Sequence, residues 1–310
     1  MSTLTAADLT SRPRLAPPGL YSVGRRRKIT SGIARGIITA SFLVALVPLV
    51  WVLMTAISRG LARLDVTFFS QSMRNIVGPG GGAIHAIWGT ALITAAATVI
   101  SLPIGLGTAI YLVEYGRGAV PTVIRFLTDV MTGIPSIVAG LFAYAVMVIV
   151  SGPGARSGIA GAIALSLLMI PVVIKSSEEM LRLVPGDLRE AAIALGSPKR
   201  TVISSVVLPS AMSGILAGVM LGVCRIIGET APLLLVAGVT TSMNLNLFSG
   251  RMMTLPVFIY SQWQNKGIPP AAYNDRAWTA ALVLIALVLV FNLAARLVSS
   301  LLAPRTAKRS

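Results

Sequence analysis

Seven long stretches of the 310-residue sequence contain no Asp, Glu, Lys, Arg or His. They are Ile37–Ile57, Ala86–Val113, Val130–Ala155, Ser157–Ile174, Thr201–Cys224, Thr230–Gly250 and Ala277–Ala295. A helix needs about 20 apolar residues to cross about 30 Å of hydrocarbon. Charged residues make up only 12% of the chain, against roughly 25% in a soluble domain. The stretches therefore predict an all-α integral membrane protein.

We expect six transmembrane helices, at approximately 36–57, 86–112, 126–150, 158–177, 207–238 and 277–301. They form one transmembrane domain (36–302) between an N-terminal arm (1–35) and a C-terminal tail (303–310), with a coupling loop at 178–208 and an external loop at 239–276. Residues 245–265 are expected to form an external loop or an interfacial helix rather than a seventh span.

The distribution of basic residues predicts the orientation in the membrane. The net charge is +16, and the charges lie at the two ends and between the apolar stretches. With six spans and the N-terminus inside, 18 Lys and Arg residues lie on the inner side and seven on the outer side. This excess predicts cytoplasmic termini in a multi-pass protein of the cytoplasmic membrane. The expected counterpart of the charge is the anionic lipid bilayer, not nucleic acid.

The coupling loop has the pattern of a helix, a turn and a second helix. Asp187 is expected to be the N-cap, with Glu190 at the third helical position to complete a capping box. Gly196 is expected to end the first helix in a left-handed conformation. Ser197 is expected to cap the second helix, with Pro198 in its first turn.

One face of the first helix in this loop is predicted to be apolar and short-chained. Leu188, Ala191, Ala192 and Leu195 follow the helical spacing i, i+3, i+4 and i+7. The two alanines would allow a partner groove to approach closely. Glu190 fits either a capping role or a docking role.

These residues also resemble a family motif. Glu190-Ala191-Ala192, followed by Gly196 and later by Leu208-Pro209, is similar to the EAA loop of ABC importer permeases. The resemblance implies a type I ABC importer permease fold, in which this loop forms a coupling helix that sits in a cleft of a separate ATPase. An aromatic residue that many members carry is absent from 201–205.

Two further stretches narrow the resemblance. Thr132–Phe142 resembles the third-span signature of phosphate importer permeases, and Arg225–Pro232 resembles their fifth-span signature, closer to the PstA type than to the sister PstC type. The resemblance implies phosphate uptake and three partners: a PstC-like permease, a cytoplasmic ATPase dimer and an extracytoplasmic phosphate-binding protein. A permease for another oxyanion, such as sulfate or molybdate, is the alternative within the class.

Arg225 and Glu229 are charged residues inside the predicted fifth span. A charge near the bilayer centre costs about 2.5–3.5 kcal/mol on insertion scales, so it needs compensation. Their four-residue spacing predicts a common helix face. They either form a locking ion pair or line an anion path, in which the Arg fork matches phosphate oxygens. The resemblance implies the second role. Asp129 is a third candidate, which could instead cap a helix near the surface.

Gly214, Gly218 and Gly222 lie at four-residue spacing in the same span, which allows close approach of another helix. The neighbouring helix belongs either to this subunit or to a partner permease.

Some activities are disfavoured by what the sequence lacks. It contains no Gly-Lys dipeptide, which excludes a G-x-x-x-x-G-K-[ST] nucleotide loop. The chain is therefore expected to be a transporter subunit and not an enzyme, with no cofactor of its own and with ATP and Mg bound by the partner ATPase. A single Cys and a single His make a metal site unexpected. A secondary transporter without an ATPase and a membrane enzyme remain as alternatives.

Overall fold

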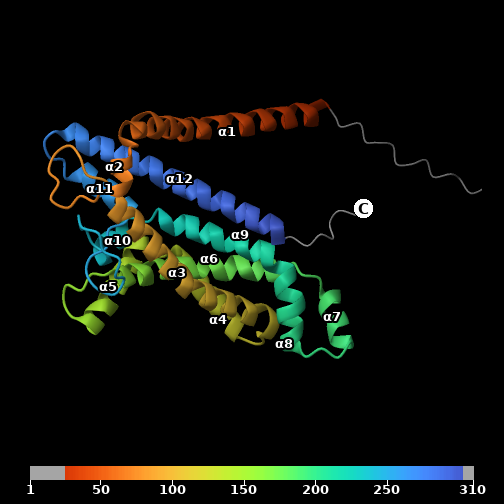
Figure 1. Cartoon of the computed structure of the whole chain (residues 1–310). Coiled ribbons are helices and arrows are strands. Elements are labelled where there is room, and N and C mark those ends of the chain that lie inside the picture. The colour runs from red at the N-terminus through yellow and green to blue at the C-terminus, as the bar shows by residue number, and fades with distance from the viewer. Residues whose placement is uncertain (1–24, 303–310) are drawn as a thin grey trace, which may run out of the picture. The chain divides into compact units, whose positions relative to one another are not determined.

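The structure, a computed structural model, describes residues 25–302. The predicted tail and most of the predicted N-terminal arm lie outside the described residues. Within residues 25–302, every regular element is a helix (Figure 1). In chain order, these are α1 (Arg25–Gly60), η2 (Leu61–Arg63), α2 (Val66–Ser70), α3 (Ile84–Ile110), η3 (Tyr111–Tyr115), α4 (Val120–Gly133), α5 (Ser136–Ser151), α6 (Gly158–Arg182), α7 (Gly186–Ala194), α8 (Lys199–Val202), η4 (Ile203–Val207), α9 (Leu208–Ile227), α10 (Ala231–Val236), α11 (Leu255–Gln264) and α12 (Pro270–Leu302).

Five helical segments are long and apolar enough to cross a membrane, and a bent pair raises the number to six. The five are Lys28–Arg63, Ile84–Tyr115, Gly158–Arg182, Lys199–Ile227 and Pro270–Leu297. The predicted all-α membrane fold is therefore confirmed. The chain divides at Met54 into two units, and the first is the apolar helix α1 up to that residue.

The predicted third span is not one straight helix. The pair α4 and α5 is bent by 105°, at a break that consists of Ile134 and Pro135. Proline lacks the N–H that would continue the helix, and it forces the preceding residue toward extended backbone. Ile134 has this conformation, with ψ at 129°. The segment predicted as a span at 126–150 is therefore a bent pair of helices, with Pro135 at the break.

The predicted fifth span, 207–238, is also interrupted. α9 ends at Ile227, and a separate short helix, α10, begins at Ala231 with Pro232 in its first turn. At the other end, α8, η4 and α9 follow one another without a gap from Lys199. The apolar segment therefore begins earlier and ends earlier than the sequence predicts.

Small residues hold the long helices of the second unit close together. α3 packs on α6, and α6 packs on α9. Gly105 of α3 lies against Val173 of α6. The three glycines of α9 face α6, where a Cβ on each would meet a side chain of that helix; they are Gly214, Gly218 and Gly222, opposite Met180, Ser176 and Met169. The glycine face therefore packs inside this subunit.

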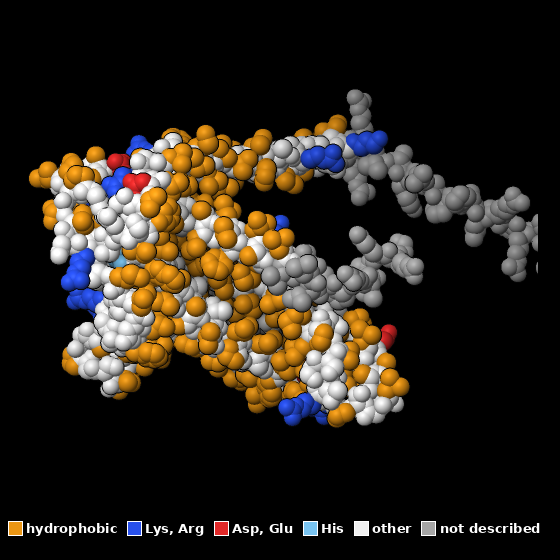
Figure 2. Space-filling model, in the orientation of Figure 1, with side chains coloured by type: hydrophobic (Ala, Val, Ile, Leu, Met, Phe, Trp, Pro, Cys, Tyr) orange, Lys and Arg blue, Asp and Glu red, His pale blue; other side chains and the backbone are white. Residues whose placement is uncertain are grey.

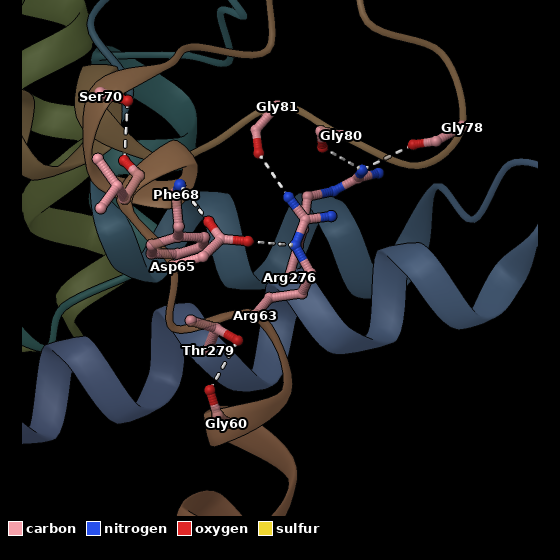
Figure 3. A network of polar contacts seen from close by, with 11 residues as sticks. Gly60, Arg63, Asp65, Phe68, Ser70, Gly78, Gly80, Gly81, Arg276 and Thr279 are labelled. Carbon is pink, nitrogen blue, oxygen red and sulfur yellow. Dashed lines mark hydrogen bonds and ion pairs between the residues drawn. The ribbon is translucent and has the colours of Figure 1, made fainter.

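A buried arginine holds the loop between α2 and α3 by hydrogen bonds (Figure 3). This loop lies at the same end of the second unit as α11 (Figure 1). Arg276 of α12 is fully buried. Its Nη1 donates to the carbonyl oxygens of Gly78 and Gly80, at 2.7 and 2.9 Å, and its Nε donates to Gln262 at 2.9 Å. The sequence placed Arg276 outside the last span, whereas α12 begins at Pro270.

A second arginine holds the same loop. Arg63 donates to the carbonyl oxygen of Gly81 at 3.1 Å and lies 3.4 Å from an oxygen of Asp65. The hydroxyl of Thr279 donates to the carbonyl oxygen of Gly60 at 2.8 Å. The α11 end of the unit is thus organised by polar contacts, and α7 and α8 lie at the opposite end (Figure 1).

Candidate coupling site and membrane charges

The first helix of the predicted coupling loop forms as α7, with a different start. Its N-cap is Pro185 in an extended conformation, and the helix begins at Gly186. Asp187 lies inside the first turn and makes no capping hydrogen bond, so the predicted capping box is wrong. A carboxylate in the first turn still stabilises a helix through its dipole.

The end of α7 is the predicted one. Gly196 has φ of +81°, the left-handed region that glycine adopts without steric cost. Its N–H donates to Ile193 O at 2.9 Å, and the N–H of Ser197 donates to Ala192 O at 3.2 Å. These two bonds make a Schellman motif, which ends the helix sharply. The N-cap of α8 is Pro198 rather than Ser197, which corrects the second capping expectation.

The chain leaves most of α7 uncovered, because no residue of this helix is buried. Glu190 and Ala191 are exposed, and Ala192 is half-buried against the hydrophobic core. Leu195, which follows the helix, is 86% exposed. Among the described residues, the side chain of Glu190 has no hydrogen-bond or ion-pair partner. An apolar surface of this kind on a loop is typical of a docking site.

The side chain that anchors α7 is Arg189, which the sequence analysis did not single out. Its Nε donates to Glu114 of η3 at 3.0 Å. Its Nη1 and Nη2 donate to the carbonyl oxygens of Val184 and Leu181, both at 2.8 Å. Leu181 lies in the last turn of α6, where a helix has no internal donors left for its last oxygens. Val184 lies in the short link between α6 and α7.

Another carboxylate at this end of the molecule holds α4 to α6. Glu178 accepts from Arg125 at 2.8 Å and from Arg182 at 2.6 Å. The Glu178 side chain is 11% exposed. This network contains no residue of α7, so it joins α4 to α6 without holding α7.

Arg225 and Glu229 do not share a helix face. Arg225 lies in the last turn of α9, whereas Glu229 follows the end of that helix at Ile227. The two residues form no ion pair. Arg225 is exposed and Glu229 is half-buried. The interpretation of a locking ion pair on one helix face is therefore wrong. Neither charge compensates the other in this structure.

The exposed side of Arg225 continues along α9. Ala217, Leu221 and Arg225 follow at four-residue spacing, and all three are exposed. Figure 2 shows hydrophobic side chains across much of the visible face of the molecule. A surface of this kind is normal in lipid, but an arginine on it is not.

Asp129 lies ten residues into α4, so it does not cap that helix. Its carboxylate pairs with the Lys175 ammonium of α6 at 2.8 Å, and the two side chains remain 66% and 41% exposed. Lys175 is seven residues from the end of α6 at Arg182, about 10 Å along the helix. This pair is a second polar point on the surface of an apolar bundle. Among the described residues, no group of three or more His, Cys, Asp or Glu could hold a metal ion.

Comparison with known proteins identifies the family. The model of the binding-protein-dependent transport system inner membrane component matches residues 101–308. The chain belongs to this permease family. The match includes α7, Gly196 and Arg225, so the candidate coupling site and the membrane charges lie within the matched residues.

Relatives of this permease cover nearly its whole length. It is 42% identical over 301 residues to "Phosphate transport system permease protein PstA 1" of Mycobacterium tuberculosis, covering 96% of this chain and 97% of the relative. It is 43% identical to the PstA of Mycobacterium leprae (88% and 90% coverage) and 39% identical to that of Yersinia pestis (88% and 90%).

Solved structures of importers share the fold of this permease. A chain of the MetNI methionine ABC transporter in an inward-facing conformation aligns with a TM-score of 0.58 and 18% identity, over 71% of this chain and 96% of that one. A chain of a bacterial alginate ABC transporter aligns with a TM-score of 0.59 and 14% identity, over 90% and 96%. At these identities the likeness establishes the fold alone.

Proposed function

We propose that this chain is a permease subunit of an ATP-driven phosphate importer in the cytoplasmic membrane. The observation that carries the proposal is the identity of 42% to a PstA permease over 96% of the chain. The sequence signatures at Thr132–Phe142 and Arg225–Pro232 fall within that alignment and support the same substrate.

The ATPase is a separate chain that docks on α7. The exposed surface of this helix supports the docking proposal, since Ala191 and Leu195 are exposed. Gly196 forms the turn that follows the helix. The chain has no Gly-x-x-x-x-Gly-Lys loop for a nucleotide. ATP and Mg are bound by the partner, and the energy of hydrolysis enters this subunit through the coupling helix.

A second, PstC-like permease completes the phosphate pathway. The argument rests on Arg225, which lies on an exposed face of a helix apolar enough to span the membrane. An arginine facing lipid is costly, whereas one facing a water-filled path or a partner subunit is not. Its planar fork of donors matches phosphate oxygens. Glu229 beside the path limits how tightly an anion is held, because conduction requires release.

The test is uptake of radiolabelled phosphate into proteoliposomes that contain this chain, its partner permease and the ATPase, with a phosphate-binding protein outside the membrane. We expect uptake only with hydrolysable ATP, and competition by phosphate but not by sulfate or molybdate. Competition by sulfate or molybdate at equal concentration would instead support the alternative oxyanion. Uptake that continues without ATP hydrolysis would indicate a secondary transporter and contradict the proposal.

A further inference from the structure

The Arg189 guanidinium joins α7 to the end of α6 and to η3, and its partner in η3 lies 75 positions away in the sequence. It lies on α7 and donates to Glu114 of η3 at 3.0 Å. It also donates to the carbonyl oxygens of Leu181, in the last turn of α6, and of Val184, just after that helix, both at 2.8 Å. The Glu114 side chain is 8% exposed and the Arg189 side chain 22% exposed. A charged pair with so little water around it is screened weakly and holds its geometry well.

The second half of the coupling loop is attached to the same point. Lys199, the first residue of α8, donates from Nζ to the backbone oxygen of Glu114. The Lys199 ammonium also lies 4.6 Å from the ring centroid of Tyr115, a distance suited to a cation–π contact. Residues on both sides of the Gly196 turn therefore attach to the last two residues of η3.

These polar contacts matter because α7 has little apolar packing of its own. No side chain of α7 is buried, and only Ala192 packs partly on the core. The chain connects α7 directly to α6 through three residues. Its connection to α3, by contrast, depends on side chains. Without the Glu114 contact, α7 would remain tied to α6 but not to the α3 segment.

The segment that receives the contacts has an irregular backbone. Tyr111–Tyr115 is a π-helical turn at the end of α3, closed by a 2.6 Å hydrogen bond from Gly116 N to Tyr111 O. Such turns are rare and frequently lie at functional sites. A turn of this kind at the end of the long helix α3, which packs on α6, can change its hydrogen-bond register without unfolding that helix.

From these contacts we propose that Glu114, Arg189 and Lys199 form a latch that carries movement of the coupling helix to α3. This inference rests on the proposed ATP-driven function, and Arg189 and Glu114 act as positioning residues within it. A simpler role for Arg189 is to cap the end of α6. That role requires the carbonyls of Leu181 and Val184 but not Glu114, so changes at Glu114 separate the two roles.

The experiment measures phosphate uptake and ATP hydrolysis separately in the same proteoliposomes. In Glu114→Gln, which keeps the size of the side chain but removes its charge, we expect phosphate transported per ATP to fall about tenfold. Association with the ATPase should be unchanged, because the docking surface of α7 is intact. Arg189→Ala should show the same fall in phosphate transported per ATP. Arg189→Lys, which keeps the charge, should transport more phosphate per ATP than Arg189→Ala.

Two controls make the result specific. Glu178→Gln removes the charge of a similarly buried carboxylate at the same end of the bundle, and its transport per ATP should equal that of the wild type. The double variant Glu114→Gln with Arg189→Ala should be no worse than Arg189→Ala alone, because residues that act as a unit are not additive.

Three outcomes would overturn the latch. One is a wild-type yield of phosphate per ATP in Glu114→Gln, and another is an equal fall in Glu178→Gln. The third is loss of the ATPase from the purified Glu114→Gln complex, which would place Glu114 in docking rather than in transmission. Failure of the proposed function is distinct, since the wild-type complex would then show no ATP-dependent phosphate uptake.

Discussion

Arg276 and Arg225 both lie in apolar helices, but the surroundings of their guanidinium groups differ. Arg276 is fully buried and donates to two loop carbonyls and to Gln262. Arg225 is exposed and forms no ion pair within the part of the chain that the structure describes. Because a charge in the membrane needs partners, Arg276 is a structural residue, whereas the partner that we propose for Arg225 is the transported anion or a second permease.

The structural role of Arg276 predicts a large loss of stability on truncation. Arg276→Ala removes three hydrogen bonds and leaves the oxygens of Gly78 and Gly80 without their donor. We expect the free energy of unfolding to fall by about 3–5 kcal/mol, as for other broken buried charge networks. Thermal unfolding in detergent measures it. Arg74→Ala, in the same loop but exposed, is the control and should change stability by less than about 0.5 kcal/mol. Equal losses of stability in Arg276→Ala and Arg74→Ala would contradict the structural role of Arg276.

The proposed role of Arg225 predicts the opposite pattern, lost transport with normal assembly. Because Arg225 is exposed, Arg225→Ala should leave the fold intact and reduce phosphate uptake about tenfold or more, the effect of losing one charged hydrogen bond to the anion. Uptake and recovery of the assembled complex are measured together. Leu221→Ala, one turn away on the same exposed face, is the matched control and should retain uptake. Normal uptake by a normally assembled Arg225→Ala complex would remove this residue from the pathway.

Single residues could be predicted from the sequence where the reason is local. The left-handed turn at Gly196 follows from the glycine itself and from the helical pattern before it. The contact between Arg189 and Glu114 joins residues 75 positions apart, and no local pattern indicates which of several arginines reaches that carboxylate. The pairing of Arg225 with Glu229 failed because it assumed a helix that continues beyond Ile227.

At the scale of the elements, apolar runs predict which segments enter the membrane but not where a helix bends. The run from Val130 to Ala155 contains no charged residue, yet the chain bends by 105° at Ile134 and Pro135. Proline in other helices has a smaller consequence, since α3 continues through Pro103 and α6 through Pro171. Packing against neighbouring helices decides between these outcomes, and a single sequence does not contain that information.

Packing between α3 and α6 gives a prediction with a control on the same helix. A Cβ on Gly105 would lie 2.6 Å from Val173 Cγ1, whereas a Cβ on Gly107 would meet nothing within 4 Å. We expect Gly105→Ala to lower the stability of the subunit by about 1–3 kcal/mol through overpacking. Gly107→Ala should be neutral or slightly stabilising, because alanine favours the helix. Thermal unfolding in detergent compares the two, and equal loss in both would show that the close approach of α3 to α6 is unimportant.

The exposed side of α7 predicts a separation of docking from membrane insertion. Ala191→Arg places a long charged side chain on an exposed position of this helix, so it should not disturb the subunit itself. We expect the ATPase to be lost from the purified complex while the amount of permease in the membrane stays constant. Glu190→Ala, at the neighbouring exposed position, tests whether the acid contributes to docking, and we expect a smaller loss. Unaltered association in Ala191→Arg would contradict docking on this face.

For the whole molecule, the number of spans decides on which side of the membrane each end lies. Counting α4 and α5 as one bent span gives six, and an even number returns the C-terminus to the side of the N-terminus. The excess of basic residues in the segments assigned to the inside then predicts that α7 lies on the cytoplasmic side. The uncharged run Thr230–Gly250, which raises the question of a seventh span, contains only the six-residue helix α10. The next helix along the chain is α11. It is ten residues long and has buried side chains, too short to cross the bilayer.

This topology is tested with two cysteines that change no charge. Leu195 follows α7 and is 86% exposed, and Ile268 follows α11 and is 87% exposed. In a Cys224→Ser background and without the ATPase, Ile268→Cys should react with a membrane-impermeant thiol reagent in spheroplasts. Leu195→Cys should react only after the membrane is made permeable, because a helix that docks the ATPase, as we propose for α7, must face the compartment that contains it. Reaction of Leu195→Cys in intact spheroplasts would invert the topology, and it would leave α7 on the side where no ATP is available.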